Sequence, residues 1–150
     1  MVTVHLVQNM HRISVSQKDF AGFMQTIKDV WNVFSTRFVE IWNAEGLDDF
    51  TFSGSVYGTP SNNDTRAAGQ ALFLKTLLDE SLLFAGTCVL RRLVGISHVH
   101  DFDSIADADV RGAAELRAFA IGRELLVEHT QFTTIESVVE RASCIQAAAR

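Results

Sequence analysis

Two adjacent arginines, Arg91 and Arg92, are the residues of this sequence best suited to bind a ligand. They stand in the apolar run CVLRRLVGI, and a planar guanidinium group matches the geometry of phosphate and carboxylate. On a helix the two side chains project about 100° apart. If that helix is buried on most sides, at least one guanidinium must find an acceptor or a solvent-filled cleft. The functional interpretation is therefore a cleft for an anion or a polyol.

An internal salt bridge is the competing interpretation of the arginine pair. Three acidic residues lie close enough in sequence to form such a salt bridge with one of the arginines, namely Glu80, Asp101 and Asp103. A buried charge is costly unless a partner of opposite charge compensates it. Spacing alone favours this structural interpretation over the ligand cleft.

A His-x-His-Asp cluster follows the arginines, with His98 and His100 two residues apart and with Asp101 and Asp103 close by. Such a cluster could ligate zinc if it lay on a strand with a carboxylate completing the set. In metal hydrolases this pattern belongs at a strand end in a large barrel, which this helical chain cannot build. We therefore expect a polar connection between two helices and no metal ligand. A zinc-dependent helical hydrolase that uses His98 and His100 remains an alternative hypothesis.

No side chain is predicted to act as a nucleophile or a general base. Cys88 lies in the same apolar run without a recognisable base, and the sequence has no Gly-x-Ser-x-Gly elbow. The glycine-containing stretch GSVYG, at 54–58, lacks the Gly-Lys-Ser/Thr ending of a phosphate-binding loop. The predicted set of catalytic residues is therefore empty.

Four helices are predicted to position these residues. Apolar side chains recur every three or four residues over 19–45 and over 67–96, and Asp107 is a suitable N-cap for a third helix. The sequence TTIE at 133–136 has the form of a capping box that opens a fourth. The only tract rich in glycine, proline and asparagine, 46–66, is predicted to be a variable loop. The predicted fold class is all-α.

Three of these helices have apolar faces that we expect to form the core. The helix predicted over 67–96 is apolar around most of its circumference, so it is predicted to be central and buried. The helix predicted over 19–45 has a wide aromatic stripe, which consists of Phe20, Phe23, Met24, Ile27, Trp31, Phe34, Phe38, Ile41 and Trp42. The apolar face of the helix over 67–96 consists of Leu72, Phe73, Leu77, Leu78, Leu82, Phe84, Ala85, Cys88 and Leu90. The apolar face of the fourth helix consists of Ile135, Val138, Val139 and Ala142.

Composition and charge argue against several classes of protein. The chain has 150 residues, 47% of them hydrophobic, and a formal net charge of −5. One domain or a part of one is expected, and binding to nucleic acid or to a membrane surface is not, because both need a basic face. No window approaches the roughly 18 apolar residues of a membrane span. The N-terminus lacks the pattern of a signal peptide, and the two cysteines have no CxxC spacing, so we expect a cytoplasmic protein.

Much of the chain closely resembles the C-terminal helices of the 5-methylthioribose kinase family. The resemblance is carried mainly by residues 89–126, which contain VLRRLVGISHVHDFDSI. In the family this run reads much like Ile-Arg-Arg-Ile-Val-Gly-x-Ala-His-Val-x-Asp-Phe-x-Ser-Ile. Three more blocks are similar and occur in the right order, at 26–46, 79–86 and 133–140. Neither the first 20 residues nor the loop resembles the family.

The resemblance implies a fold, a reaction and a site. The fold would be the C-terminal helical subdomain of a protein-kinase-like, aminoglycoside-phosphotransferase-like fold, with 1–20 as a divergent N-terminal segment and 21–146 as the helical part of the C-lobe. The family transfers the γ-phosphate of ATP to the 1-hydroxyl of 5-methylthioribose in methionine salvage, as cytosolic homodimers with magnesium. Arg91 and Arg92 would then help to hold the sugar substrate and the transferring phosphate.

The chain departs from the family in what a kinase needs for catalysis. Such an enzyme uses a phosphate-covering loop with an anchoring lysine, a catalytic-loop aspartate and a magnesium-binding acid. The sequence has no Gly-x-Gly-x-x-Gly and no His-Gly-Asp or His-Arg-Asp, and His100 stands where the family usually has an acid. We therefore expect a truncated C-terminal portion that, by itself, is inactive and binds neither ATP nor magnesium. Whether this chain is an enzyme stays open. The alternative is a non-catalytic helical binding module derived from the family.

Overall fold

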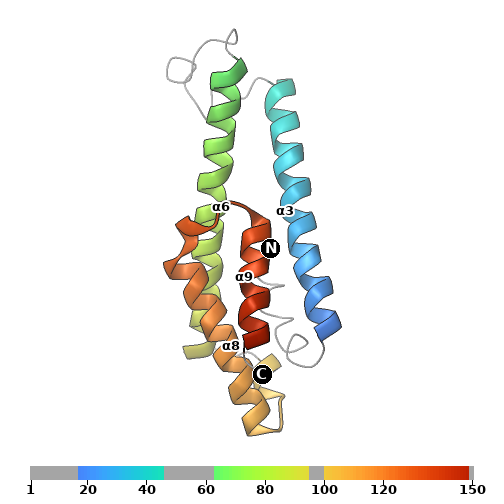
Figure 1. Cartoon of the computed structure of the whole chain (residues 1–150), viewed down its shortest axis with the longest axis vertical. Coiled ribbons are helices and arrows are strands. Elements are labelled where there is room, and N and C mark those ends of the chain that lie inside the picture. The colour runs from blue at the N-terminus through green and yellow to red at the C-terminus, as the bar shows by residue number, and fades with distance from the viewer. Residues whose placement is uncertain (1–16, 46–62, 95–99, 149–150) are drawn as a thin grey trace.

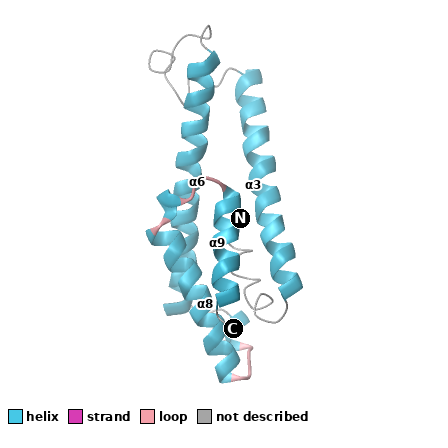
Figure 2. Cartoon of the chain, viewed as in Figure 1, coloured by secondary structure: helices cyan, strands magenta, loops and turns pink. Residues whose placement is uncertain are grey.

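The computed structural model of the chain describes residues 17–45, 63–94 and 100–148, most of which form helices (Figure 1, Figure 2). In chain order these are α3 (Gln17–Glu45), α6 (Asn63–Val94), α7 (His100–Asp103), α8 (Ala108–Val127), the 3-10 helix η1 (His129–Gln131) and α9 (Ile135–Ala148). The described residues contain no strand, so the all-α prediction is confirmed.

The helices form two parts that differ in how many neighbours each helix has. In the four-helix part, α8 and α9 lie along the lower halves of α3 and α6 in Figure 1. In the two-helix arm, defined as residues 34–45 of α3 and 63–73 of α6, these two helices extend beyond α8 and α9 (Figure 1). No other described helix lies beside the arm.

Helices α6 and α8 pack together more extensively than any other two described helices, because a glycine lies on each at their close approach. A Cβ atom on Gly86 would lie 2.7 Å from the carbonyl oxygen of Gly122 and 2.7 Å from the backbone nitrogen of Leu126. A Cβ atom on Gly122 would lie 2.9 Å from Cγ1 of Val89. Any larger residue would force the two helices apart.

Helix α9 and the first half of α3 complete the core of the four-helix part. On α9 the buried residues are Ile135, Val138 and Ala142, which confirms the face predicted for the fourth helix. The core residues contributed by α3 are Phe20, Met24 and Ile27. The remaining core is mostly small or aliphatic, with Ala85, Ala114 and Ala118 among its members, and it also includes Phe102 and Phe132.

The two-helix arm is held by aromatic rings. The rings of Phe38 and Phe73 stack with centroids 5.5 Å apart, and Trp42 meets the edge of Phe73 at 5.4 Å. Beyond these rings, Gln70 Nε2 donates a hydrogen bond of 2.9 Å to Asn43 Oδ1. Trp42 is only 2% exposed, so the arm has one well-buried anchor.

The prediction that both long apolar faces are core is only partly correct. On α3, Phe34 is 41% exposed and Ile41 is 49% exposed, and on α6, Leu72 and Phe84 are more than half exposed. A stripe wider than about 100° needs more than one partner helix to cover it. The arm provides only one partner, and α8 covers a single side of α6 in the four-helix part.

The ends of three helices refine the predicted boundaries. Helix α6 begins at Asn63, inside the tract predicted as a loop, and the predicted end of this helix at residue 96 lies outside the described residues. Asp107 caps α8 as predicted, since its Oδ1 accepts hydrogen bonds from the backbone N–H groups of Asp109 at 2.9 Å and Val110 at 3.1 Å. None of the described helices has the length and apolar character to cross a membrane.

The capping box of α9 lies one residue later than predicted. Helix α9 begins at Ile135, so Thr134 takes the N-cap position and Ser137 the third helical position. The Ser137 N–H donates to Thr134 Oγ1 at 3.3 Å, and the Thr134 N–H donates to Ser137 Oγ at 3.4 Å. Glu136 is thereby left to interact with α3.

Candidate anion-binding site at the end of helix α6

The last turn of α6 carries both arginines predicted to bind a ligand. Val89 is buried and Leu93 packs against the core, which fixes the side of the helix that faces inward. Arg91 is exposed and Arg92 is half-buried. The prediction that this turn is buried on most sides is therefore wrong, because only one of its faces meets the core. Positive side chains also interact favourably with the C-terminal end of a helix dipole.

The salt-bridge interpretation finds no support within the described part of the chain. The ion pairs in the described part of the chain are Arg37–Glu40, Lys75–Asp79 and Arg141–Glu124. Among these residues, neither Arg91 nor Arg92 is paired with Glu80 or Asp103, and the side chain of Asp101 lies outside the described set. The two guanidinium groups thus present positive charge at the helix end without a described carboxylate to neutralise it.

The connection between α7 and α8 is fixed by two buried side chains. Phe102 of α7 and Ile105 just after it are 4% and 8% exposed, and the Ile105 N–H donates to the Phe102 carbonyl oxygen at 3.1 Å. Asp107 then caps α8. The connection from α7 to α8 is therefore held in place by buried side chains and by the cap of α8.

The predicted His-x-His-Asp cluster lies largely outside the described residues. The side chains of His98, His100 and Asp101 are not among those described. Elsewhere in the described part, no group of three or more potential metal-ligating side chains comes together. The connector interpretation and the zinc hypothesis both remain predictions.

Two polar contacts tie α9 to the helices around it. Arg141 Nη2 donates a hydrogen bond of 2.6 Å to Glu124 Oε1 of α8, and Asn32 Nδ2 of α3 donates one of 3.3 Å to Glu136 Oε1. The hydrogen bond from Arg141 lowers the pKa of Glu124, and the same contact raises the pKa of Arg141. The pKa of Glu136 is lowered first by its own backbone N–H and then by Asn32.

The glycine contact between α6 and α8 is the positioning feature that sequence reasoning missed. Gly86 and Gly122 lie in the interior of long predicted helices, in the stretches FAGTC and AIGREL. Such a glycine lowers helix propensity by about 1 kcal/mol relative to alanine, so its presence signals a packing reason. The contact lies little more than one helical turn before Arg91 and fixes where α8 passes α6.

The chain is similar to part of several methylthioribose kinases. It is 36% identical over 118 residues to methylthioribose kinase 2 of Oryza sativa, which covers 77% of this chain and 27% of that protein. It is 32% identical over 122 residues to methylthioribose kinase of Escherichia coli, covering 79% of this chain and 28% of that protein. A Geobacillus thermodenitrificans methylthioribose kinase is 29% identical over 134 residues. No protein-family model matches the chain.

The chain spans between about a quarter and a third of the length of these relatives. The all-helical architecture fits the helical C-terminal part of a kinase-like fold.

Proposed function

Because the chain belongs by sequence to the methylthioribose kinase family, we propose that it is the C-terminal helical portion of such a kinase, the portion that contributes Arg91 and Arg92 to the substrate side of the active site. The observation that carries this proposal is the pair of arginines at the end of α6, outside any described ion pair. The complete enzyme would use ATP and magnesium to phosphorylate 5-methylthioribose at its 1-hydroxyl.

The chemistry of the arginine pair supports this assignment. A phosphoryl group in transfer spreads negative charge over its oxygens, and catalysis depends on positioning and on fixed positive charge. Guanidinium groups supply that charge without reorganising as the reaction proceeds. A single guanidinium can also donate two parallel hydrogen bonds to sugar hydroxyls or to phosphate oxygens.

The 150 residues alone are proposed not to phosphorylate methylthioribose. They contain neither the aspartate-bearing catalytic loop nor the glycine-rich loop on which this type of phosphoryl transfer depends. A coupled assay for ADP release, with purified chain, ATP, magnesium and 5-methylthioribose, should give no turnover above a protein-free blank. Turnover that persists in the double variant R91Q/R92Q would point to contamination, and turnover that this variant abolishes would contradict the proposal.

A non-catalytic binding module derived from the kinase family is the second candidate function. The exposed position of Arg91 favours it, because a ligand can reach this guanidinium without any further part of an enzyme. Calorimetric titration of the chain with 5-methylthioribose 1-phosphate separates the two candidates. A module should bind the sugar phosphate and lose that binding in R91Q/R92Q, whereas a portion that needs the remaining lobe should show no saturable heat.

The resemblance also leads us to propose a cytoplasmic protein that pairs with a second copy. The exposed apolar residues of the arm and of α8, such as Phe34 and Leu116, support self-association. Light scattering over a range of concentrations should give a molar mass above that of one chain. A monomer at all concentrations would contradict this part of the proposal.

A further inference from the structure

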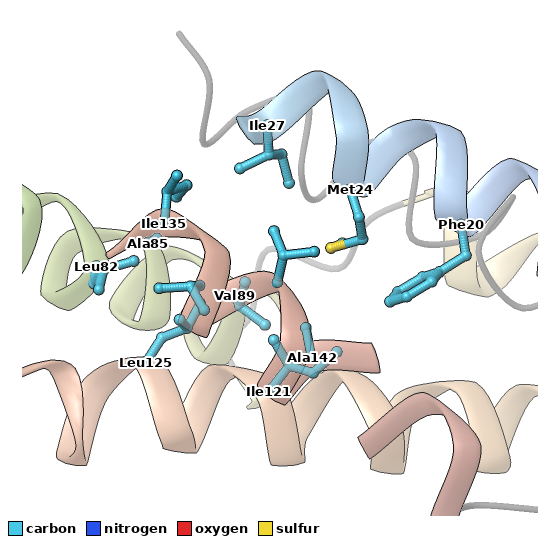
Figure 3. A pocket seen from close by; sticks show the side chains of 12 residues that line it. Phe20, Met24, Ile27, Leu82, Ala85, Val89, Ile121, Leu125, Ile135 and Ala142 are labelled. Carbon is cyan, nitrogen blue, oxygen red and sulfur yellow. The ribbon is translucent and has the colours of Figure 1, made fainter. Parts of the chain in front are cut away.

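A cavity of about 60 Å³ lies inside the four-helix part, where α3 faces α6, α8 and α9 (Figure 3). Figure 3 shows Phe20, Met24 and Ile27 reaching from α3 toward the side chains of the other three helices. The lining side chains among the described residues are all apolar, namely Phe20, Met24, Ile27, Leu82, Ala85, Val89, Ile121, Leu125, Ile135, Val138, Val139 and Ala142. The cavity is thus a packing gap between one helix and the three others.

The cavity has room for water but nothing to hold it. One water molecule needs roughly 10–15 Å³ of such volume together with two to four polar partners. The lining side chains provide no polar partner, because none carries a hydrogen-bonding nitrogen or oxygen. Apolar cavities of this kind stay dry and accept small apolar molecules instead. Their walls also lose the dispersion contacts that a filling atom would provide.

Helix α3 depends on this region for its attachment. Three of its four buried residues, Phe20, Met24 and Ile27, line the cavity. The polar contact between α3 and α9 in the described part is the exposed hydrogen bond of 3.3 Å from Asn32 to Glu136. By comparison, α8 and α9 share an ion pair of 2.6 Å, and α6 and α8 touch through their backbones at two glycines. An atom placed in the cavity would add contacts between α3 and the three other helices.

We propose that this cavity is a binding site for a compact apolar molecule, of the size of xenon or of a two- to three-carbon hydrocarbon, and that occupancy strengthens the docking of α3 onto α6, α8 and α9. The site is independent of Arg91 and Arg92. The flexible side chain of Met24 is the group best able to close the cavity by changing its rotamer. The experiment must therefore distinguish an open cavity from one that has collapsed.

The direct test is a titration of the full 150-residue chain with dissolved xenon, followed by NMR of the methyl groups. The expected result is a saturable shift of the cavity methyls, for example those of Ile27, Leu125 and Val138, while methyls of exposed residues such as Val33 and Leu116 shift weakly and linearly. Amides of residues 20–27 should exchange with solvent several-fold more slowly under xenon. Weak linear shifts at all methyls would mean a collapsed cavity and would overturn the proposal.

The substitution Ala142→Val fills the cavity from α9 and should abolish the saturable xenon shift. Its control is Ala147→Val, which makes the same change at an exposed position in the last turn of the same helix. Relative to this control, Ala142→Val should raise the melting temperature by about 3 °C. A lower melting temperature than the control, with xenon shifts unchanged, would contradict the proposal. If Ala142→Val does not fold, the xenon titration of the unchanged chain decides the question alone.

Discussion

The four-helix part and the two-helix arm bury apolar surface in different ways. In the four-helix part, α6 and α8 approach closely at Gly86 and Gly122, and mostly small or aliphatic side chains, together with a few phenylalanines, fill the remaining space. In the arm, α3 and α6 are held apart by aromatic rings, and Trp42 is the deeply buried residue among them. Close backbone contact needs several surrounding helices, whereas large rings allow two helices to share a small core.

As a result, the four-helix part is closely packed, whereas the two-helix arm leaves apolar side chains exposed. Arg91 and Arg92 lie at the end of α6 in the four-helix part, little more than one helical turn after the glycine contact with α8. At 32 residues, α6 is about 48 Å long, so the arm begins far from the arginines. The contrast predicts that substitutions in the arm affect stability, and that those near the glycine contact also affect the site.

The largest effect is expected from Trp42→Ala in the arm. Removing a buried indole that contacts two other rings should lower the free energy of unfolding by about 3 kcal/mol. Urea denaturation measures this loss, and hydrogen exchange should show faster opening of the arm than of α8. The control is Phe34→Ala, at a ring that is already 41% exposed and should cost less than half as much. Equal losses for the two variants would mean that the arm has no buried anchor.

The next effect is expected from Gly86→Ala in the four-helix part. The new Cβ would lie 2.7 Å from backbone atoms of α8, so α8 must move. The resulting strain outweighs the roughly 1 kcal/mol gained in helix propensity, for a net loss of about 2 kcal/mol. Urea denaturation again gives the value. Gly112→Ala on α8 is the matched control, because its Cβ meets nothing within 4 Å, and it should be stabilising. A stabilising Gly86→Ala would rule out the backbone contact.

A smaller effect is expected from acid. The pKa of Glu124 is lowered in the folded chain by the hydrogen bond from Arg141, so this pair stabilises the fold at pH values above the usual glutamate pKa of about 4.3. That stabilisation should be lost as the pH falls through the lowered pKa of Glu124. Thermal melts between pH 6 and pH 3 should show a shallower decline for Glu124→Gln than for the unchanged chain. Parallel declines would mean that the pair contributes nothing.

The sequence predicts the helices better than it predicts what surrounds them. Periodicity and caps located all four long helices, because Asp107 and the TTIE stretch carry local signals that do not depend on partners. The exposure of Phe34 and Phe84 was not predictable, since periodicity reports which residues share a face and not how many helices cover it. The glycine contact was missed because it is a property of two helices together. The sequence identifies the arginine pair by residue type. It does not predict that the pair has no described ion-pair partner, because that depends on how the helices are arranged in space.

The most direct test of the proposed site is a chimera of the Escherichia coli methylthioribose kinase in which the matched 122 residues are replaced by those of this chain. The chimera should phosphorylate 5-methylthioribose. Arg91→Gln or Arg92→Gln should lower its kcat/KM roughly 100-fold, since each removes charge-assisted hydrogen bonds to the reacting group. Arg123→Gln, at an exposed arginine of α8, should change kcat/KM less than twofold. An active chimera in which all three variants behave alike would contradict the assignment of the arginine pair to the substrate side of a kinase.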